Sequence, residues 1–476
     1  MSFLTRRKPL DSITHQDAAH KLKQTLSWPH LVAMGVGAIV GTGIYTLTGV
    51  GAGLAGPAVI LSFLLCGVIC SCAALCYAEM STMIPAAGSA YTYTYAVLGE
   101  FLAWIIGWSL VLEYTVGSAA VAVGWSAHVA EFLHGHVPGQ LLYGFATIDP
   151  DTGMHGLINL PAVLVTLAVT VLLVIGTRES ATVNLVLVAI KISALVLFVV
   201  LASQRFDLSN FHPFLPFGLL AKADPDGTKR GVLAAAAIIF FAFWGFDAVS
   251  TAAEETKNPG RDLKIGIIGS MAACTAIYII VAAAALGAVQ YTVIAKTAAP
   301  LVYVLNALRY PIAGEIIALA AVVALPSVIL VLLYGQSRIF FVMARDGLIP
   351  RGLAAIHKTR GTPAVMTTIT GLVAAAFAGT FDISHIAELA NAGTLCAFVA
   401  VSLCVLVMRV REPDRARTFR VPLAWIVAPV CIAGCTYLFI VGLRDITHRF
   451  FLYSNIIGIT VYFLYGVRAS RLAKQG

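Results

Sequence analysis

The first long apolar segment of this chain contains the stretch Gly35-Val36-Gly37-Ala38-Ile39-Val40-Gly41-Thr42-Gly43-Ile44-Tyr45. Four of these residues are glycines, and a glycine inside a helix costs about 1 kcal/mol relative to alanine. The stretch therefore predicts a break in a helix that is otherwise apolar enough to cross a bilayer. A break within a membrane is tolerated only where it is buried in protein or lines a cavity, so the freed backbone groups can hold a polar solute there.

The composition of the whole chain places this segment in a membrane protein. Of the 476 residues, 59% are hydrophobic and 11% are charged, whereas soluble domains have roughly 45–50% apolar and 25% charged residues. Twelve apolar runs approach the roughly 17–25 residues that a membrane helix needs, and little sequence remains for a soluble catalytic domain. The runs lie at residues 31–54, 57–79, 96–130, 159–176, 182–203, 231–253, 264–288, 315–344, 364–380, 385–408, 422–441 and 450–467.

Lysine and arginine are distributed unevenly between the loops that join these runs. If the N-terminus is inside, the cytoplasmic segments carry 22 of them and the outer segments carry 8. The positive-inside rule then predicts that both termini are cytoplasmic. The net charge of +8 is spread over separate loops, so it predicts topology and no nucleic-acid partner. The first 28 residues contain no short apolar run or cleavage site, so a cleaved signal peptide is not expected.

The nine cysteines do not predict a metal site. Four of them lie on the second predicted helix, namely Cys66, Cys70, Cys72 and Cys76. The first two and the last two face opposite sides of that helix, so they cannot converge on one ion, and we expect them to act as small hydrophobic residues. His134 and His136 lie in a predicted outer loop, where a solvated loop is favoured over a metal site.

Two ionisable side chains lie deep inside predicted spans. Lys191 is near the middle of the fifth run, and Glu113 is midway along the third. A lysine at the centre of a membrane helix costs roughly 2.5–3.5 kcal/mol on insertion scales, so such residues face the protein interior and mark candidate functional sites. Lys191 is either a static lysine held by an ion pair or carbonyls, or one that exchanges a proton, because burial disfavours its charged form. Glu113 either contacts a cationic group, relays protons, or is a hydrogen-bonded structural carboxyl.

The sixth run carries the string Phe240-Phe241-Ala242-Phe243-Trp244-Gly245-Phe246-Asp247. This run would open the second half of a five-plus-five repeat, just as the first run opens the first half. Interrupted segments at corresponding places in two halves indicate a binding site near the bilayer midplane. Here the interruption depends on Gly245, and Asp247 is expected to cap the second half-helix.

Together with short motifs along nearly the whole chain, these features resemble the amino acid–polyamine–organocation transporters, and most of all the prokaryotic members of the cationic amino acid transporter family. Each motif is weak alone, but their order and spacing are specific. The motifs are Gly176-Thr177-Arg178-Glu179-Ser180, Glu254-Glu255-Thr256-Lys257-Asn258-Pro259, Arg345-Asp346-Gly347-Leu348-Ile349-Pro350, Glu388-Leu389-Ala390-Asn391-Ala392-Gly393-Thr394-Leu395 and Phe419-Arg420-Val421-Pro422.

The resemblance implies an all-α polytopic membrane protein with 12 transmembrane helices. Ten of them would form a LeuT-type core of two inverted five-helix repeats, in which helices 1 and 6 are broken, and two would be peripheral. The expected divisions are a cytoplasmic segment at 1–28, the transport core at 29–408, a basic cytoplasmic loop at 409–421, and the peripheral helices with a short tail at 422–476.

The resemblance also implies a function. It predicts a permease that moves amino acids across the cell membrane by alternating access and proton-coupled symport, with exchange through the same site as the alternative. The expected partners are an amino acid, a proton and membrane lipid, without a cofactor, a metal or a recognisable protein partner. The implied substrate-binding residues are Ile39, Gly41, Thr42, Gly43, Glu113, Phe241, Ala242 and Trp244.

Several of these residues receive a role from the family. The amides of Thr42 and Gly43 match positions that bind the substrate carboxylate, and the carbonyls of Ile39, Phe241 and Trp244 match positions that accept from its ammonium group. Phe241 also matches the aromatic residue that closes over the substrate from outside. Helix physics agrees, because the half-helix starting near Gly43 presents its positive end, and the half ending near Ile39 presents free carbonyls.

Lys191 matches a lysine that takes a sodium position of related transporters and couples transport to protons. Trp244 is larger than the aliphatic residue usual in the family, and Lys264 stands where proline is common. Glu113 and Trp244 are expected to shape the side-chain end of the pocket and to give a broad profile of small neutral and some cationic amino acids. The rival classes are a membrane-embedded enzyme, for which the runs contain no His-Glu-x-x-His or Gly-x-Ser-x-Gly motif, and a non-transporting sensor.

Overall fold

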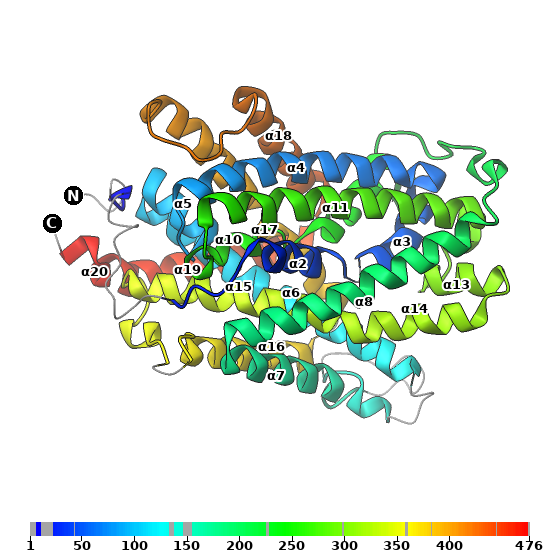
Figure 1. Cartoon of the computed structure of the whole chain (residues 1–476), viewed down its shortest axis with the longest axis horizontal. Coiled ribbons are helices and arrows are strands. Elements are labelled where there is room, and N and C mark those ends of the chain that lie inside the picture. Colours follow the sequence, from blue (N-terminus) through cyan, green and yellow to red (C-terminus); the bar gives the residue numbers. More distant parts are fainter. Residues whose placement is uncertain are drawn as a thin grey trace.

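The computed structural model of the chain is a bundle of long helices (Figure 1). The segment at residues 6–10 and the helix α20 lie at the same end of this bundle, where the Arg6 guanidinium donates to the carbonyl oxygen of Val467 over 3.0 Å. The structure describes residues 6–10, 22–41, 43–132, 138–145, 155–224, 228–297, 299–357, 360–381, 383–443 and 445–474.

Most of the described residues from Trp28 to Ser203 are helical. Short 3-10 turns occur at Gly56–Ala58, Gly139–Leu141 and Leu208–Phe211. The helices are α2 (Trp28–Ile39), a π-helical turn (Gly43–Leu47), α3 (Thr48–Ala55), α4 (Val59–Met83), α5 (Ser89–Val97), α6 (Glu100–Phe132), α7 (Leu160–Ile175) and α8 (Thr177–Ser203).

The second half begins with a small antiparallel pair of strands, β1 (Lys222–Ala223) and β2 (Lys229–Arg230). Short 3-10 turns follow at Phe240–Phe243, Ala253–Glu255, Arg351–Ala354 and Leu472–Lys474. The helices are α9 (Val232–Ile239), α10 (Ala248–Thr251), α11 (Pro259–Ala288), α12 (Tyr291–Ile294), α13 (Pro300–Ala307), α14 (Pro311–Ala324), α15 (Pro326–Arg345), α16 (Ala364–Thr380), α17 (Ile383–Arg411), α18 (Ala424–Gly442), α19 (Asp445–Val461), a second π-helical turn (Tyr462–Gly466) and α20 (Val467–Ala469).

Prolines and a polar cap set where several helices begin. Pro259, Pro300 and Pro311 each stand at the first position of a helix, where the missing N–H has no partner to lose. Pro326 separates α14 from α15 within the eighth apolar run, because a proline in a helix interior removes a hydrogen bond. The Asn159 side chain accepts from the amide of Ala162 and caps α7.

Nine helical stretches among the described residues are long and apolar enough to cross a membrane, and α7 and α16 are two shorter apolar helices. All twelve predicted runs coincide with helices. The first two runs count together as one of the nine, Trp28–Met83, although α2 ends at Ile39 and helical structure resumes only at Gly43. The chain is therefore a predominantly helical, polytopic membrane protein, while the number of twelve spans stays a prediction.

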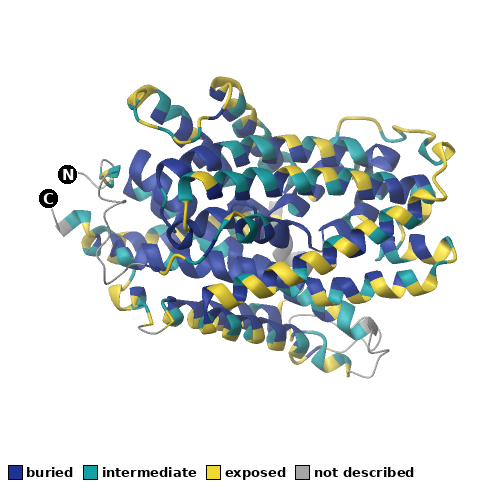
Figure 2. Cartoon of the chain, viewed as in Figure 1, coloured by how far each residue is buried: buried dark blue, intermediate teal, exposed yellow. Residues whose placement is uncertain are grey.

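Burial divides the bundle into an inner and an outer set of helix faces (Figure 2). Buried residues line the centre, including both predicted breaks, and exposed residues run along the outer faces of α8, α14 and α18. Many of these exposed side chains are large and apolar, for example Ile312 and Trp425. Such an outer surface fits a membrane protein, and it leaves the polar groups of the two breaks enclosed in the middle.

Candidate functional site

The first apolar run is interrupted where its glycines predicted. α2 ends at Ile39, and helical structure resumes at Gly43 as a π-helical turn. Thr42, one of the predicted substrate-binding residues, lies outside the described residues. The end of a helix leaves its last carbonyls without partners in the helix, and here the carbonyls of Gly37, Ile39 and Val40 accept hydrogen bonds from side chains of other helices.

Lys191 of α8 holds two of these carbonyls. Its Nζ donates to the oxygen of Gly37 over 2.9 Å and to that of Val40 over 2.5 Å, and the side chain is completely buried. The Ser327 hydroxyl, near the start of α15, lies 3.3 Å from the same Gly37 oxygen. The lysine thus joins the inner side of the first break to α8, and it does so through carbonyls. Lys191 therefore makes the contact with backbone carbonyls that the sequence predicted.

Tyr278 of α11 connects the two breaks, and sequence reasoning missed it. Its hydroxyl lies 2.6 Å from the carbonyl oxygen of Ile39 and 2.9 Å from that of Ala242. A hydroxyl has one proton, so it donates to the two acceptors in turn or shares the proton between them. The signal in the sequence was a single phenol in the otherwise apolar string Ala276-Ile277-Tyr278-Ile279.

The second break lies in the sixth apolar run. α9 ends at Ile239, and after a 3-10 turn the chain turns at Gly245, whose φ of +106° is strained for other residues, before α10 begins at Ala248. Asp247 occupies the position before α10, but its side chain makes no capping hydrogen bond. The predicted cap is therefore wrong. The carboxylate instead accepts from the Tyr114 hydroxyl of α6 over 2.5 Å.

The two breaks pack directly against each other. A Cβ atom added to Gly43 would lie 2.5 Å from the Cβ of Ala242, and one added to Gly245 would lie 2.8 Å from the Cβ of Ala38. Both distances are too short for real side chains, so this approach requires glycine at both positions. Gly41 is similarly enclosed, because an added Cβ would lie 2.9 Å from Val328 of α15.

Glu113 accepts hydrogen bonds from two other elements. The indole N–H of Trp244, in the second break, and the hydroxyl of Thr394, in α17, both donate to its Oε1, the latter over 2.5 Å. Glu113 is completely buried, and Trp244 is 3% exposed. In this arrangement the carboxyl group accepts hydrogen bonds from the protein itself. This corresponds to the hydrogen-bonded structural carboxyl, one of the three interpretations that the sequence left open.

The indole of Trp244 lies between the second break and α6. It stacks on Phe241 with ring centroids 5.7 Å apart and an interplanar angle of 28°, and it lies 6.3 Å from the ring of Tyr114. On α6 it covers Gly117, where an added Cβ would lie 1.7 Å from the indole Cη2. The described members of the predicted binding set therefore lie on the two breaks and on the face of α6 opposite them.

No group of three histidine, cysteine or acidic side chains that could hold a metal occurs among the described residues. His134 and His136 lie outside that part of the chain. The four cysteines of α4 are free thiols, of which Cys72 alone is not fully buried. These side chains pack as small apolar residues.

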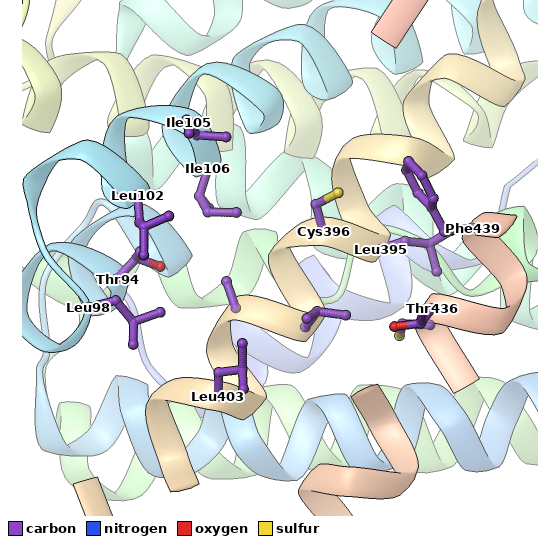
Figure 3. A pocket seen from close by; sticks show the side chains of 13 residues that line it. Thr94, Leu98, Leu102, Ile105, Ile106, Leu395, Cys396, Leu403, Thr436 and Phe439 are labelled. Atoms are coloured by element: carbon purple, nitrogen blue, oxygen red, sulfur yellow. The ribbon is translucent and has the colours of Figure 1, made fainter. Parts of the chain in front are cut away.

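Among the described residues, two larger cavities lie away from the contact between the breaks. One, of about 330 Å³, is an apolar groove between the start of α6, α17 and α18 (Figure 3). The other, of about 810 Å³, is lined by Tyr45 of the π-helical turn, His128 of α6 and residues of α13 and α14. Helix α13 lies at the end of the bundle opposite the segment at 6–10 (Figure 1). Because Tyr45 lines this cavity, it lies next to the half-helix that follows the first break.

Two interrupted helices that meet inside a bundle of membrane helices are typical of membrane transporters. Residues 26–462 match the family model described as amino acid permease, and the chain belongs to this family. It is 40% identical over 478 residues, the full length of both proteins, to the methylthioribose transporter of Bacillus subtilis (strain 168). It is also 40% identical to the branched-chain amino acid permease BcaP of the same organism, over 99% of each chain.

A plant relative covers less of the chain. The vacuolar cationic amino acid transporter 4 of Arabidopsis thaliana is 37% identical over 425 residues, which are 87% of this chain and 68% of the relative. The family and these relatives identify a membrane transporter and not an enzyme, as the sequence predicted.

Proposed function

We propose that this chain moves amino acids across the cell membrane by alternating access, with the substrate bound at the two helix breaks and with proton symport as the driving process. The observation that supports this most directly is the contact between the breaks, where Gly43 lies against Ala242 and Tyr278 bridges Ile39 and Ala242. Backbone groups of both halves of the chain are thereby gathered at one buried point. Relatives named for branched-chain and cationic amino acids support the substrate class.

The main chain of an amino acid has one anionic and one cationic end, and the breaks offer a complement to each. The half-helix that begins at Gly43 presents amides and the positive end of its dipole to a carboxylate. The carbonyls of Ile39, Phe241 and Trp244 would accept from the ammonium group. A carbonyl oxygen has two lone pairs, so Ile39 can accept from the ammonium and from Tyr278 together. Gly41, Thr42 and Ala242 complete the proposed set.

The proposed architecture is a LeuT-type core of two inverted five-helix repeats plus two peripheral helices. The interruptions support it, because they fall in the first and the sixth of the twelve runs, which are the opening helices of the two repeats. The division into segments at 1–28, 29–408, 409–421 and 422–476 follows from the same count. The excess of lysine and arginine in alternate loops supports cytoplasmic termini and a place in the cell membrane.

Lys191 is the proposed proton-linked residue. Hydrogen bonds donated by an ammonium group are roughly twice as strong as those between neutral groups. Protonated Lys191 therefore holds Gly37 and Val40 firmly, and loss of the proton loosens this hold and favours the other arrangement of the first break. The ammonium group already lies on the Gly37 oxygen, which Ser327 of the eighth run also contacts. No sodium ion is therefore needed between the first and the eighth runs.

The test is uptake by purified protein in liposomes, with radiolabelled amino acids and three conditions: an inward proton gradient, an inward sodium gradient, and neither. We expect accumulation with the proton gradient alone. Liposomes preloaded with an unlabelled amino acid distinguish symport from exchange. An exchanger takes up labelled amino acid only into preloaded liposomes.

Methylthioribose belongs in the same panel because a full-length relative is named for it. This sugar has no carboxylate or ammonium group, so uptake of methylthioribose without uptake of any amino acid would contradict the proposed substrate class. Accumulation driven by sodium alone would contradict the proposed coupling.

A further inference from the structure

The side-chain end of the proposed substrate site is filled by a residue of the protein itself. Trp244 leaves the second break, stacks on Phe241, and ends against the backbone of α6 at Gly117. Glu113 lies one helical turn before Gly117 on the same face of α6, and it receives the indole N–H. The indole thus spans the gap between the break and α6, which is the direction in which a substrate side chain would extend from the main-chain site.

We infer that Trp244 closes this end of the site and restricts the transporter to small neutral amino acids, by filling the space and by standing between the second break and the carboxyl group of Glu113, whose Oε1 accepts its N–H. The inference rests on the proposed function and names its substrate class. It differs from the expectation drawn from the sequence, which included some cationic substrates.

The hydrogen bonds explain why a cationic side chain is refused. Oε1 of Glu113 already accepts from Trp244 and Thr394. Its other oxygen, Oε2, is buried without a hydrogen-bond donor among the described residues, and it lies against α17, 3.0 Å from where a Cβ of Gly393 would stand. A lysine or arginine substrate would have to displace the indole and leave its buried N–H without an acceptor, which is unfavourable. The hydrogen bond of the indole to Glu113 and the bulk of the indole therefore both disfavour a cationic substrate side chain.

A substitution at Gly117 tests the position of the Trp244 indole independently. An added Cβ would lie 1.7, 2.4 and 2.7 Å from three atoms of the indole. Gly117→Ala therefore displaces the ring without changing Trp244 or Glu113. If the seated ring sets the selectivity, this variant should relax it in the same direction as a substitution of Trp244.

The experiment measures inhibition of labelled alanine uptake, and binding to the purified protein, by glycine, alanine, leucine, lysine and arginine. In the parent, we expect glycine and alanine to compete and lysine and arginine to fail. In Trp244→Leu, we expect the affinity for leucine and lysine relative to alanine to rise by about tenfold or more, the range that a few methylene-sized contacts give. Trp244→Phe keeps a flat ring but loses the N–H and should lie between.

Glu113→Gln separates charge from space. In the parent background, it should leave the failure of lysine unchanged. In the Trp244→Leu background, it should remove the gain for lysine and keep the gain for leucine. Trp108→Leu is the matched control, because Trp108 is on the same helix but donates to Ser454, away from the breaks, and its selectivity should equal that of the parent.

The outcomes distinguish this inference from the proposed function. Lysine that binds the parent as tightly as alanine overturns the inference, as does a Trp244→Leu or Gly117→Ala protein that binds alanine but gains neither leucine nor lysine. If Trp244→Leu does not fold, Gly117→Ala carries the test. A parent that binds alanine with the stated selectivity but does not transport it contradicts the proposed transport and leaves the inference supported. A parent that binds no amino acid contradicts both.

Discussion

Lys191 is buried among carbonyls that a single helix break releases, and its charge is the property that the proposed coupling uses. We expect Lys191→Ala to lower net uptake by about tenfold or more, because a hydrogen bond from a charged group contributes roughly 1.5–3 kcal/mol. The remaining uptake should no longer depend on pH, while binding of substrate in detergent survives. Uptake measured over a series of pH values tests this.

Lys264→Ala is the control for that variant, because Lys264 is only partly buried near the start of α11. A Lys191→Ala protein that keeps the full pH response would show that the lysine is a static support of the break.

Gly43 has no side chain at the point where the two breaks touch. Gly43→Val should abolish uptake, because its side chain would meet Ala242, where even a Cβ atom lies 2.5 Å away. The family resemblance assigns the amide of Gly43 to the substrate carboxylate, which the valine side chain would also obstruct, but the separation of the two breaks is the more direct cause. Gly53→Ala in α3, where the added Cβ lies 3.3 Å from Ala295, should retain uptake. Folded protein that retains uptake after Gly43→Val would contradict the site.

The hydroxyl of Tyr278, in α11, bridges the first break and the second break. Tyr278→Phe removes that hydroxyl and leaves the carbonyls of Ile39 and Ala242 without this donor. We expect the free energy of unfolding to fall by about 1–3 kcal/mol, the cost of a buried unsatisfied group, and the uptake rate to fall as well. Thermal unfolding in detergent and uptake in liposomes measure the two effects.

Tyr437→Phe, at a partly exposed tyrosine of α18, controls for the loss of a phenol as such. Equal unfolding temperatures for the two variants would mean that the bridge contributes nothing to stability.

The breaks differ in how far the sequence predicted them. The first was readable from local chemistry, because four glycines weaken a helix wherever it packs. The second depended on Gly245, whose positive φ is visible only in the structure. The contacts of Tyr278 and Trp244 could not be predicted, because each joins elements that are distant in the sequence. Glu113 and Trp244, for example, are 131 residues apart. Their meeting depends on how α6 packs against the sixth run, which local patterns do not encode.

Over the whole molecule, the end that carries the segment at 6–10 is closed by ion pairs between separate elements. Lys8 pairs with Asp346 over 2.5 Å, and Arg345 pairs with Glu254 over 2.7 Å. Arg338 of α15 pairs with Glu255, which follows α10, over 2.8 Å, and both side chains are almost completely buried. The pairs of Arg345 and Arg338 tie α15 to the 3-10 turn that follows α10. The proposed alternating access would require this end to open, and we expect these contacts to form in only one of its two states.

The pair of Arg338 and Glu255 therefore gives a test at this scale. Arg338→Ala leaves a buried carboxylate without its partner, and we expect the free energy of unfolding to fall by about 3–5 kcal/mol. The guanidinium also lies 3.8 Å from the ring centroid of Tyr334, so packing is lost as well. Arg415→Ala is the matched control, since Arg415 pairs with Glu412 at the surface, where the expected loss is about 0–1 kcal/mol.

The functional consequence follows from the same pair. If the pair stabilises only the state that is closed at this end, Arg338→Ala shifts the population toward the open state. A cysteine placed at Met34, which lines a small cavity with Thr177 and Tyr334, should then react faster than in the parent with a thiol reagent added from the side of the segment at 6–10. Arg415→Ala should leave that rate unchanged. An Arg338→Ala protein that is destabilised but labelled no faster would show that the pair supports both states equally, and that opening occurs elsewhere in the bundle.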